Sequence, residues 1–194
     1  MSIADRLRIR DVKLLSDSWY VLKSTTFDWL RADGRWSTST RETYDRGNGA
    51  VLLPYNLKTG QVLLCRQFRY PAYVNGYDGL LIEAAAGLLD DASPEDRIRA
   101  EVEEELGYRL TSTRKVFEAF MSPGSVTEKL HFFVAEYDAS MRVSDGGGLA
   151  DEGEEIEVME LGLGDALAMI ADGRIIDAKT IMLLQHVALH VFPR

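Results

Sequence analysis

The stretch GLLDDASPEDRIRAEVEEELGY, residues 87–108, contains a helix with clear start and stop signals. Ser93 is a preferred N-cap residue, and Pro94 suits the first helical position. Gly107 is the kind of residue that most often ends a helix. An apolar stripe along the helix consists of Ile98, Val102 and Leu106. The stretch therefore predicts a helix over residues 94–106 whose striped side faces a core.

Three carboxylates lie beside that stripe. Glu101, Glu104 and Glu105 stand at i, i+3 and i+4, so they share one helix face and repel one another. On that face only Arg97, one turn before Glu101, offers compensation. Such acids usually form a solvated surface, but these acids border a core stripe. A hard divalent cation such as Mg²⁺ takes carboxylate and phosphate oxygens as ligands, and it would convert the repulsion into a site for an anionic substrate.

The composition excludes several classes of protein. Lys and Arg total 22 against 31 Asp and Glu, and the net charge of −9 argues against broad contact with a nucleic-acid backbone. The single cysteine, Cys65, permits no intramolecular disulfide and lies in an apolar run, so we expect a buried thiol. No signal-peptide core and no run of ~20 apolar residues for a membrane span is found, so we expect no membrane partner and a cytoplasmic location.

The pattern along the chain predicts an α+β protein. Residues 1–45 are polar and alternating, with a turn at Asp33-Gly34, and they predict a small antiparallel β appendage. Residues 46–194 predict a second domain, a mixed β-sheet flanked by helices. Its predicted strands are 50–55, 61–68, 79–87, 130–137 and 154–161, and its predicted helices are 94–106, 165–171 and 178–191.

Several motifs together resemble one family. Residues Glu101 to Tyr108 match the tail of the Nudix box, E-U-x-E-E-x-G-U with U apolar, whereas Ala100 and Ala92 replace the Arg and the first Glu of that box. Further matching segments are YDRGNGA (44–50), RQFR (66–69), YVNG (73–76), AGLLDD (86–91), MSPGSVTE (121–128), GGG (146–148) and DAKT (177–180). Over about residues 10–185 the chain resembles the GDP-mannose pyrophosphatase group of Nudix hydrolases, which is close to the ADP-ribose pyrophosphatases.

This resemblance implies an α/β/α Nudix fold and an enzyme that uses Mg²⁺, with Mn²⁺ as a substitute, to hydrolyse GDP-mannose to GMP and mannose 1-phosphate. It places the metal on Glu101, Glu105, the Ala86 carbonyl and an acid of the loop SDGGGLADEGEE (144–155). Reading from the glycines selects Glu152 for metal binding or as the base, and reading back from the next strand selects Glu154 as the reserve. The resemblance further implies that Glu104 binds metal or holds the ligands in place. The glycines favour a mobile lid.

The resemblance also implies the substrate contacts, which are Trp19, Arg41, Glu42, Arg69, Ala86, Gly87, Glu128 and Lys179. Other interpretations of three of these residues stay open, because Trp19 also fits a core aromatic, Arg69 a salt bridge and Lys179 a solvated surface. A homodimer is expected, in which the amino-terminal strands contribute to the partner's site. Two alternatives to the function remain: the same chemistry on ADP-ribose or another nucleotide sugar, and a non-catalytic Nudix-fold sensor, which the intact E-x-x-E-E disfavours.

Overall fold

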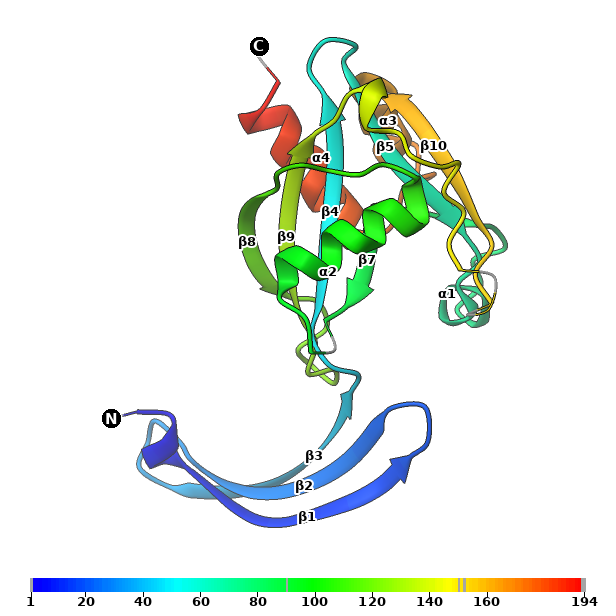
Figure 1. The fold of residues 1–194 in the computed structure, drawn as a ribbon. Helices are drawn as coiled ribbons and strands as arrows, with labels where there is room; N and C mark the ends of the chain where they lie inside the picture. Colours follow the sequence, from blue (N-terminus) through cyan, green and yellow to red (C-terminus); the bar gives the residue numbers. More distant parts are fainter. Residues whose placement is uncertain (1, 90, 150, 152, 193–194) are drawn as a thin grey trace. The chain divides into compact units, whose positions relative to one another are not determined.

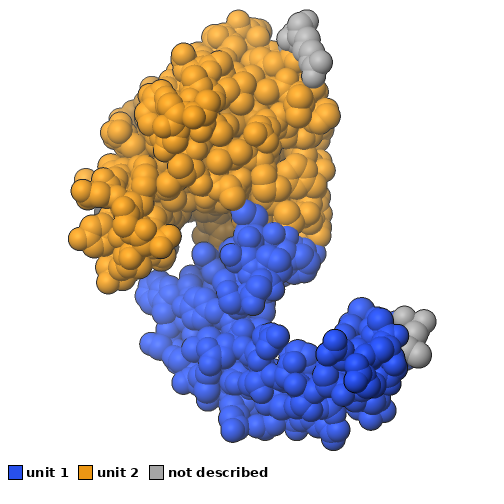
Figure 2. Space-filling view, turned by 180° about the vertical axis from the view of Figure 1, so that it is seen from behind, with its two compact units in different colours: residues 1–48, 120–129 blue, residues 49–119, 130–194 orange. Residues whose placement is uncertain are grey.

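The computed structural model describes residues 2–89, 91–149, 151 and 153–192. The chain divides into two compact units, shown in different colours in Figure 2. Unit 1 comprises Met1–Asn48 and Phe120–Lys129, and unit 2 comprises Gly49–Ala119 and Leu130–Arg194. Each unit has its own sheet.

Unit 1 is built on a three-stranded antiparallel sheet with the order β1-β2-β3 (Figure 1). Its strands are β1 (Leu7–Asp17), β2 (Val21–Leu30) and β3 (Trp36–Asp45), preceded by a short 3₁₀ helix, Ala4–Arg6. The predicted turn is present between β2 and β3, where Gly34 has φ +79°. The segment 120–129 joins this unit through backbone hydrogen bonds, including one from Tyr44 N to Ser125 O of 2.8 Å.

Polar and cation–π contacts hold the sheet of unit 1 together. Among the described residues of this unit, only Asp28 is buried, and its carboxylate accepts hydrogen bonds from Arg10 Nε (2.6 Å) and Thr38 Oγ1 (2.8 Å). The hydrogen bond from Arg10 holds the pKa of Asp28 below its ordinary value. Arg6 lies 4.4 Å from the ring centroid of Trp29. The described part of unit 1 therefore contains no buried apolar core of its own.

Unit 2 is a mixed seven-stranded sheet with the order β10-β5-β4-β9-β8, in which β6 also pairs with β5 and β7 with β4. The β4–β9 pair is parallel, whereas β4–β5 and β5–β10 are antiparallel. The strands are β4 (Gly49–Asn56), β5 (Gln61–Gln67), β6 (Leu81–Glu83), β7 (Ala85–Leu88), β8 (Arg114–Phe120), β9 (Lys129–Glu136) and β10 (Ile156–Gly162). The helices are α1 (Tyr70–Val74), α2 (Pro94–Glu101), α3 (Leu163–Ala171) and α4 (Ala178–His190).

Helices cover both faces of this sheet. Figure 1 shows α2 in front of the strands and α4 behind them. The side chains of the core on the α2 side include Leu52, Leu63, Cys65, Ile98, Val102, Leu106 and Phe133. The predicted apolar stripe of the helix is therefore confirmed as core, and the predicted burial of the Cys65 thiol is confirmed as well. No helix in the described part of the chain has both the length and the apolar character needed to cross a membrane.

The predicted strand over residues 79–87 is wrong as a continuous element. It is two short strands, because β6 pairs with β5 through Glu83 opposite Cys65, whereas β7 pairs with β4 through Ala86 opposite Val51. At the break between them, Ala84 N donates a hydrogen bond to the Thr180 hydroxyl (2.7 Å). The sequence shows one apolar run here because both short strands are largely buried, and burial alone does not reveal a change of partner strand.

The predicted helix over residues 94–106 is also two segments. Ser93 caps the start and accepts a hydrogen bond from Asp96 N (3.1 Å), and α2 ends at Glu101. The next turn, Val102–Leu106, is π-helical, and Gly107 closes it with φ +80°. Single π-helical turns occur often at functional sites, and this turn carries two of the three predicted site acids.

The loop that follows β9 is bound to the end of this π-helical turn. Gly147 N donates to Glu105 O (3.0 Å), Gly148 N donates to Glu104 O (3.1 Å), and Val143 N donates to Gly107 O (2.8 Å). The three accepting carbonyls lie at the end of the helix, where no backbone N–H of the helix itself is left to bind them. In the structure the glycines allow the loop backbone to approach the helix end closely. The mobile lid expected from these glycines stays a prediction.

This close approach predicts a specific cost for a side chain at Gly107. A Cβ there would clash with Ser144 O and would lie 2.7 Å from Gly146 N, whereas a Cβ at Gly173, which has a similar φ of +82°, would meet nothing within 4 Å. Gly173→Ala should lower the free energy of unfolding by about 1 kcal/mol through backbone strain, and Gly107→Ala by at least twice as much. Urea denaturation of both variants measures the difference, and equal losses would contradict the packing described here.

Candidate functional site

The three predicted site acids on the helix do not share one environment. Glu101 and Glu105 are buried, and Glu104 is half-buried and lines a surface hollow on another side of the π-helical turn. The three carboxylates were expected to share one helix face, and the structure separates Glu104 from the other two. The structure brings Glu101 and Glu105 together, and the charge of Glu101 acts directly on the titration of Glu105.

Glu101 lies between a cation and the backbone of β7. Its Oε1 accepts an ion pair from Arg97 Nη2 (2.5 Å), as the spacing in the sequence predicted. A Cβ at Gly87 would overlap the Glu101 carboxylate, so glycine at this position leaves room for the acid against the strand. Glu101 thus lies beside the segment that contains Ala86, which is the backbone ligand expected from the resemblance.

Glu105 is the most unusual group of the site. The residue is 2% exposed, and its Oε2 has no hydrogen-bond partner among the residues that the structure describes. Burial raises its pKa from the ordinary 4.5 to about 8, and the negative charges of Glu101, Glu154 and Glu83 add to this effect while Arg69 opposes it. A buried carboxyl in this state is stabilised either by a proton or by a cation.

These residues fit a divalent cation, although no complete set of ligands is visible. Over the described ranges, no group of three or more His, Cys, Asp and Glu side chains is arranged to hold a metal ion. The unpartnered oxygen of Glu105 and the neighbouring Glu101 provide two hard oxygen donors, which is the type that Mg²⁺ prefers. Glu152, the loop acid favoured as the third, lies outside the described residues.

Glu154, the alternative loop acid, is described and lies near the same site. Its Oε2 accepts a hydrogen bond from Leu149 N (2.9 Å), so the carboxylate folds back over its own loop. Its charge contributes to the raised pKa of Glu105. The structure therefore places Glu154 within electrostatic range of the buried carboxyl.

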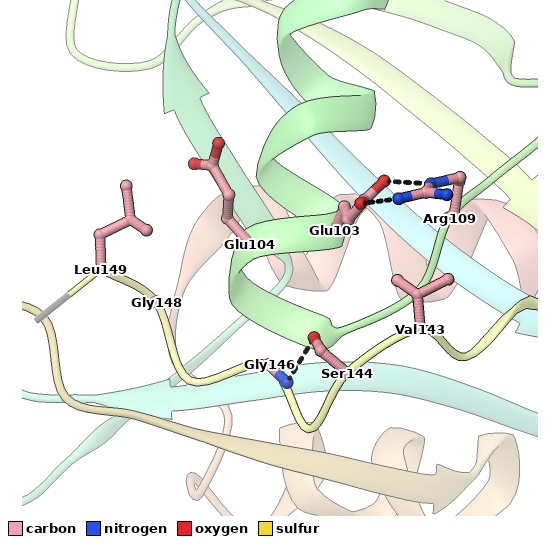
Figure 3. A pocket seen from close by; sticks show the side chains of 8 residues that line it. All are labelled: Glu103, Glu104, Arg109, Val143, Ser144, Gly146, Gly148 and Leu149. Atoms are coloured by element: carbon pink, nitrogen blue, oxygen red, sulfur yellow. Dashed lines mark hydrogen bonds and ion pairs between the residues drawn. The ribbon is translucent and has the colours of Figure 1, made fainter.

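Figure 3 shows the hollow that Glu104 lines, which has a volume of about 350 Å³. Its other lining residues come from the turn after the helix and from the glycine-rich loop, and they include Arg109, Val143, Gly146 and Leu149. The Glu104 side chain points away from the paired Glu103 and Arg109, which make a two-point contact through Nε–Oε2 (2.8 Å) and Nη2–Oε1 (2.5 Å). Glu104 is thus available to this hollow, whereas Glu103 is held by Arg109.

Two predicted substrate contacts, Arg69 and Lys179, meet at a buried acid that the sequence reasoning missed. Arg69 Nε donates to Glu83 Oε2 (2.7 Å), and Lys179 forms ion pairs with Glu83 and with Asp177 (2.9 Å). Burial alone would lower the pKa of Lys179, but Glu83 and Asp177 raise it above its ordinary value. The interpretation of Lys179 as a solvated lysine is therefore wrong. The sequence feature that could have indicated a buried acid is the position of Glu83 as the single charged residue in the apolar run LLIEAAAG.

The remaining predicted contacts lie in unit 1. Trp19 is 82% exposed, so the interpretation as a core aromatic is wrong, and its ring lies 6.0 Å from that of Tyr20. Arg41 and Glu42 are exposed on β3. Glu128 is half-buried and paired with Arg46 at 3.4 Å. The exposed indole of Trp19 leaves a flat apolar surface that suits stacking on a planar ring.

Known proteins share most of this sequence. The GDP-mannose pyrophosphatase of Pectobacterium atrosepticum is 56% identical and covers 92% of this chain and 92% of its own length. The chain belongs to the GDP-mannose pyrophosphatase family of Nudix hydrolases. Two proteins with the same name agree with this assignment. The one from Yersinia enterocolitica is 55% identical and the match covers 92% of this chain and 93% of that protein. The one from Yersinia pestis is 53% identical and the match covers 93% of this chain and 91% of that protein.

Two further comparisons concern the amino-terminal region and the fold. The family described as "GDP-mannose pyrophosphatase NudK N-terminal domain" matches residues 6–44, which cover most of the three-stranded sheet. A crystal structure of an ADP compounds hydrolase superposes with a TM-score of 0.72 at 18% identity, covering 95% of this chain and 93% of that one. At this low identity the likeness shows the fold alone, and it confirms the predicted α+β class.

The raised pKa of Glu105 predicts how the metal-free protein responds to pH. The folded state retains a proton that the unfolded state loses above about pH 4.5, so the free energy of unfolding should fall as pH rises from about 5 to 8. One such proton contributes a slope of up to about 1.4 kcal/mol per pH unit. Urea denaturation in EDTA should show this slope in the wild type, and Glu105→Gln should remove it. Parallel curves for the two proteins would show that Glu105 does not titrate in this way.

Proposed function

We propose that this chain hydrolyses the diphosphate bond of GDP-mannose and releases GMP and mannose 1-phosphate. The observation that carries the proposal is the identity of 53–56% to relatives named GDP-mannose pyrophosphatase over more than nine-tenths of the chain. The buried pair Glu101 and Glu105 supports it, because two carboxylates suit a divalent cation and such a cation would offset the charge of a diphosphate.

The proposed metal is Mg²⁺, with Mn²⁺ as a substitute, and it would be held by Glu101, Glu105, Glu152 and the Ala86 carbonyl. When bound, it would offset the charge of the diphosphate and increase the acidity of a coordinated water. Glu105 contributes an oxygen without any other partner among the described residues, and Glu101 would exchange its ion pair with Arg97 for this role.

The loop acids and Glu104 are proposed to handle protons and to orient the site. Glu152 is the favoured base and Glu154 the reserve, and the proximity of Glu154 to Glu105 supports a role for this loop in catalysis. Glu104 lies in the hollow beside the glycine-rich loop, where it can orient the groups around it. The backbone hydrogen bonds from Gly147 and Gly148 to the helix end keep the loop next to both helix acids.

The substrate contacts that the resemblance implies are proposed for each unit by itself. In unit 2, Arg69, Lys179 and the Ala86–Gly87 backbone would bind the charged and sugar parts of the substrate. In unit 1, Trp19 would stack on the base, and Arg41, Glu42 and Glu128 would form polar contacts. The exposure of Trp19, Arg41 and Glu42 supports this assignment, because these side chains are free to meet a ligand.

We also propose that the protein is a homodimer in the cytoplasm. The three-stranded sheet exposes large apolar side chains along one strand, namely Ile9, Val12, Leu14 and Leu15, with Trp19 following. Such a surface usually marks an interface, and a second copy of this chain would cover it. The buried free thiol of Cys65 agrees with a reducing compartment.

A panel of nucleotide sugars tests the proposed reaction. With Mg²⁺, chromatography should show GMP release from GDP-mannose with the highest kcat/KM among GDP-mannose, ADP-ribose, ADP-glucose and UDP-glucose. A clear preference for ADP-ribose would replace the proposed substrate while keeping the reaction. Tight binding of GDP-mannose without any product would instead identify a sensor that does not catalyse.

Light scattering after size exclusion tests the dimer. The wild type should elute at twice the monomer mass, and Leu14→Glu should shift the population towards the monomer by placing a charge in the apolar surface. Lys13→Glu is the matched control, because this neighbouring side chain points to the opposite face of β1. A monomeric wild type, or equal effects of the two variants, would contradict this interface.

A further inference from the structure

The buried carboxylate of Glu83, on β6, joins three parts of unit 2. Glu83 is 3% exposed, and its two oxygens accept ion pairs from Arg69 and from Lys179. Arg69 precedes α1 directly, and Lys179 lies in the first turn of α4. A single acid in an apolar strand therefore fixes the positions of two cations that are far apart in the sequence.

The Arg69 guanidinium is held at one side and is open at the other. Only its Nε takes part in the hydrogen bond to Glu83 (2.7 Å), and no hydrogen bond of its two Nη atoms is found within the described part of the chain. The side chain is 40% exposed. The Nη atoms, which form the part of the fork that binds phosphate or carboxylate oxygens, are thus left for a ligand.

This guanidinium also lies near the buried acid pair. Arg69 follows the end of β5, and β5 packs against the π-helical turn that carries Glu105. An anion bound to the Nη atoms would therefore lie close to the proposed reacting centre. This is where the diphosphate of a nucleotide sugar has to be placed.

We propose that Glu83 is a positioning residue of the reaction, which orients Arg69 towards the diphosphate of the substrate. The proposal rests on the proposed function, since it assigns a role at the same site. Held through Nε, the guanidinium is ordered before the substrate arrives, so less side-chain entropy is lost on binding. Glu83 itself touches no substrate and acts through Arg69.

Lys179 and Asp177 complete the cluster of charged side chains around Glu83. Lys179 is 13% exposed and lies between the Glu83 and Asp177 carboxylates. Asp177 caps α4 by accepting from Thr180 N (3.0 Å), and the Thr180 hydroxyl accepts from Ala84 N (2.7 Å), next to Glu83. The two cations and the two carboxylates balance in charge, and the Nη atoms of Arg69 stay open to an anion.

This arrangement makes single substitutions interpretable. In Arg69→Ala, Lys179 still compensates Glu83, and in Glu83→Gln, Asp177 still compensates Lys179, so neither variant leaves an isolated buried charge. Glu83→Asp keeps the charge but is one methylene shorter, which withdraws the carboxylate from the guanidinium. It is the second variant if Glu83→Gln proves too unstable to fold.

A double-mutant cycle separates positioning from mere stabilisation. KM and kcat for GDP-mannose with Mg²⁺ would be measured for the wild type, Glu83→Gln, Glu83→Asp, Arg69→Ala and the double variant Glu83→Gln/Arg69→Ala. Glu157→Gln is the matched control, because it removes an exposed ion pair to Arg66 on the same sheet. Thermal unfolding of every variant reports the structural effect independently of the kinetics.

The expected result is a loss that depends on Arg69. Glu83→Gln and Arg69→Ala should each raise KM about 10- to 100-fold, as expected for the loss of a charged hydrogen bond to a ligand. Glu83→Asp should raise KM in the same direction, and the double variant should be no worse than Arg69→Ala alone. Full additivity, or a folded Glu83→Gln with a KM within about twofold of the wild type, would overturn the positioning role.

Binding of inorganic pyrophosphate with Mg²⁺, followed by calorimetry on the same proteins, distinguishes the two levels of the proposal. If the wild type does not cleave GDP-mannose, but the effects of the Glu83 and Arg69 substitutions on the Kd for pyrophosphate are non-additive, the proposed function fails and the role of Glu83 stands. If the wild type cleaves GDP-mannose and both cycles are additive, the role of Glu83 fails alone.

Discussion

The buried carboxyl of Glu105, with one oxygen that finds no partner among the described residues, is the constraint on which the site depends. A protein does not leave such a group uncompensated without cost, because desolvation penalises its charged form. Glu101 beside it makes the ionised state still less favourable. A proton satisfies the group in the metal-free protein, and a divalent cation would satisfy it better, since it would also attract a diphosphate.

The surrounding fold can be understood as the means of keeping this carboxyl in place. The apolar stripe fixes α2 on the sheet, the π-helical turn sends Glu104 to a separate hollow, and Gly87 leaves room for Glu101. The glycine-rich loop binds the carbonyls of Glu104 and Glu105, so the acids of the loop and of the helix are linked through backbone hydrogen bonds. On the other side, Arg69 supplies positive charge from a position that Glu83 sets.

Much of the fold was predictable because its signals are local. The cap at Ser93, the stop at Gly107 and the first hairpins follow from residues close together in the sequence. The division of residues 79–87 into two strands and the π-helical turn were not predictable, since they depend on partner strands and on a loop about forty residues away. In the site, Glu101 and Glu105 were predicted as neighbours, whereas the role of Glu83 depends on Lys179, which only tertiary structure brings close.

Calorimetric titration of Mg²⁺ into the metal-free protein, without substrate, shows whether the buried Glu105 carboxyl holds a divalent cation. Glu105→Gln removes the unpaired oxygen, and Glu103→Gln is the matched control on the same turn, where the acid is already held by Arg109. We expect saturable binding to the wild type and to Glu103→Gln, and a loss of at least about tenfold in affinity in Glu105→Gln. Unchanged Mg²⁺ affinity in a folded Glu105→Gln would contradict a cation-binding role for Glu105.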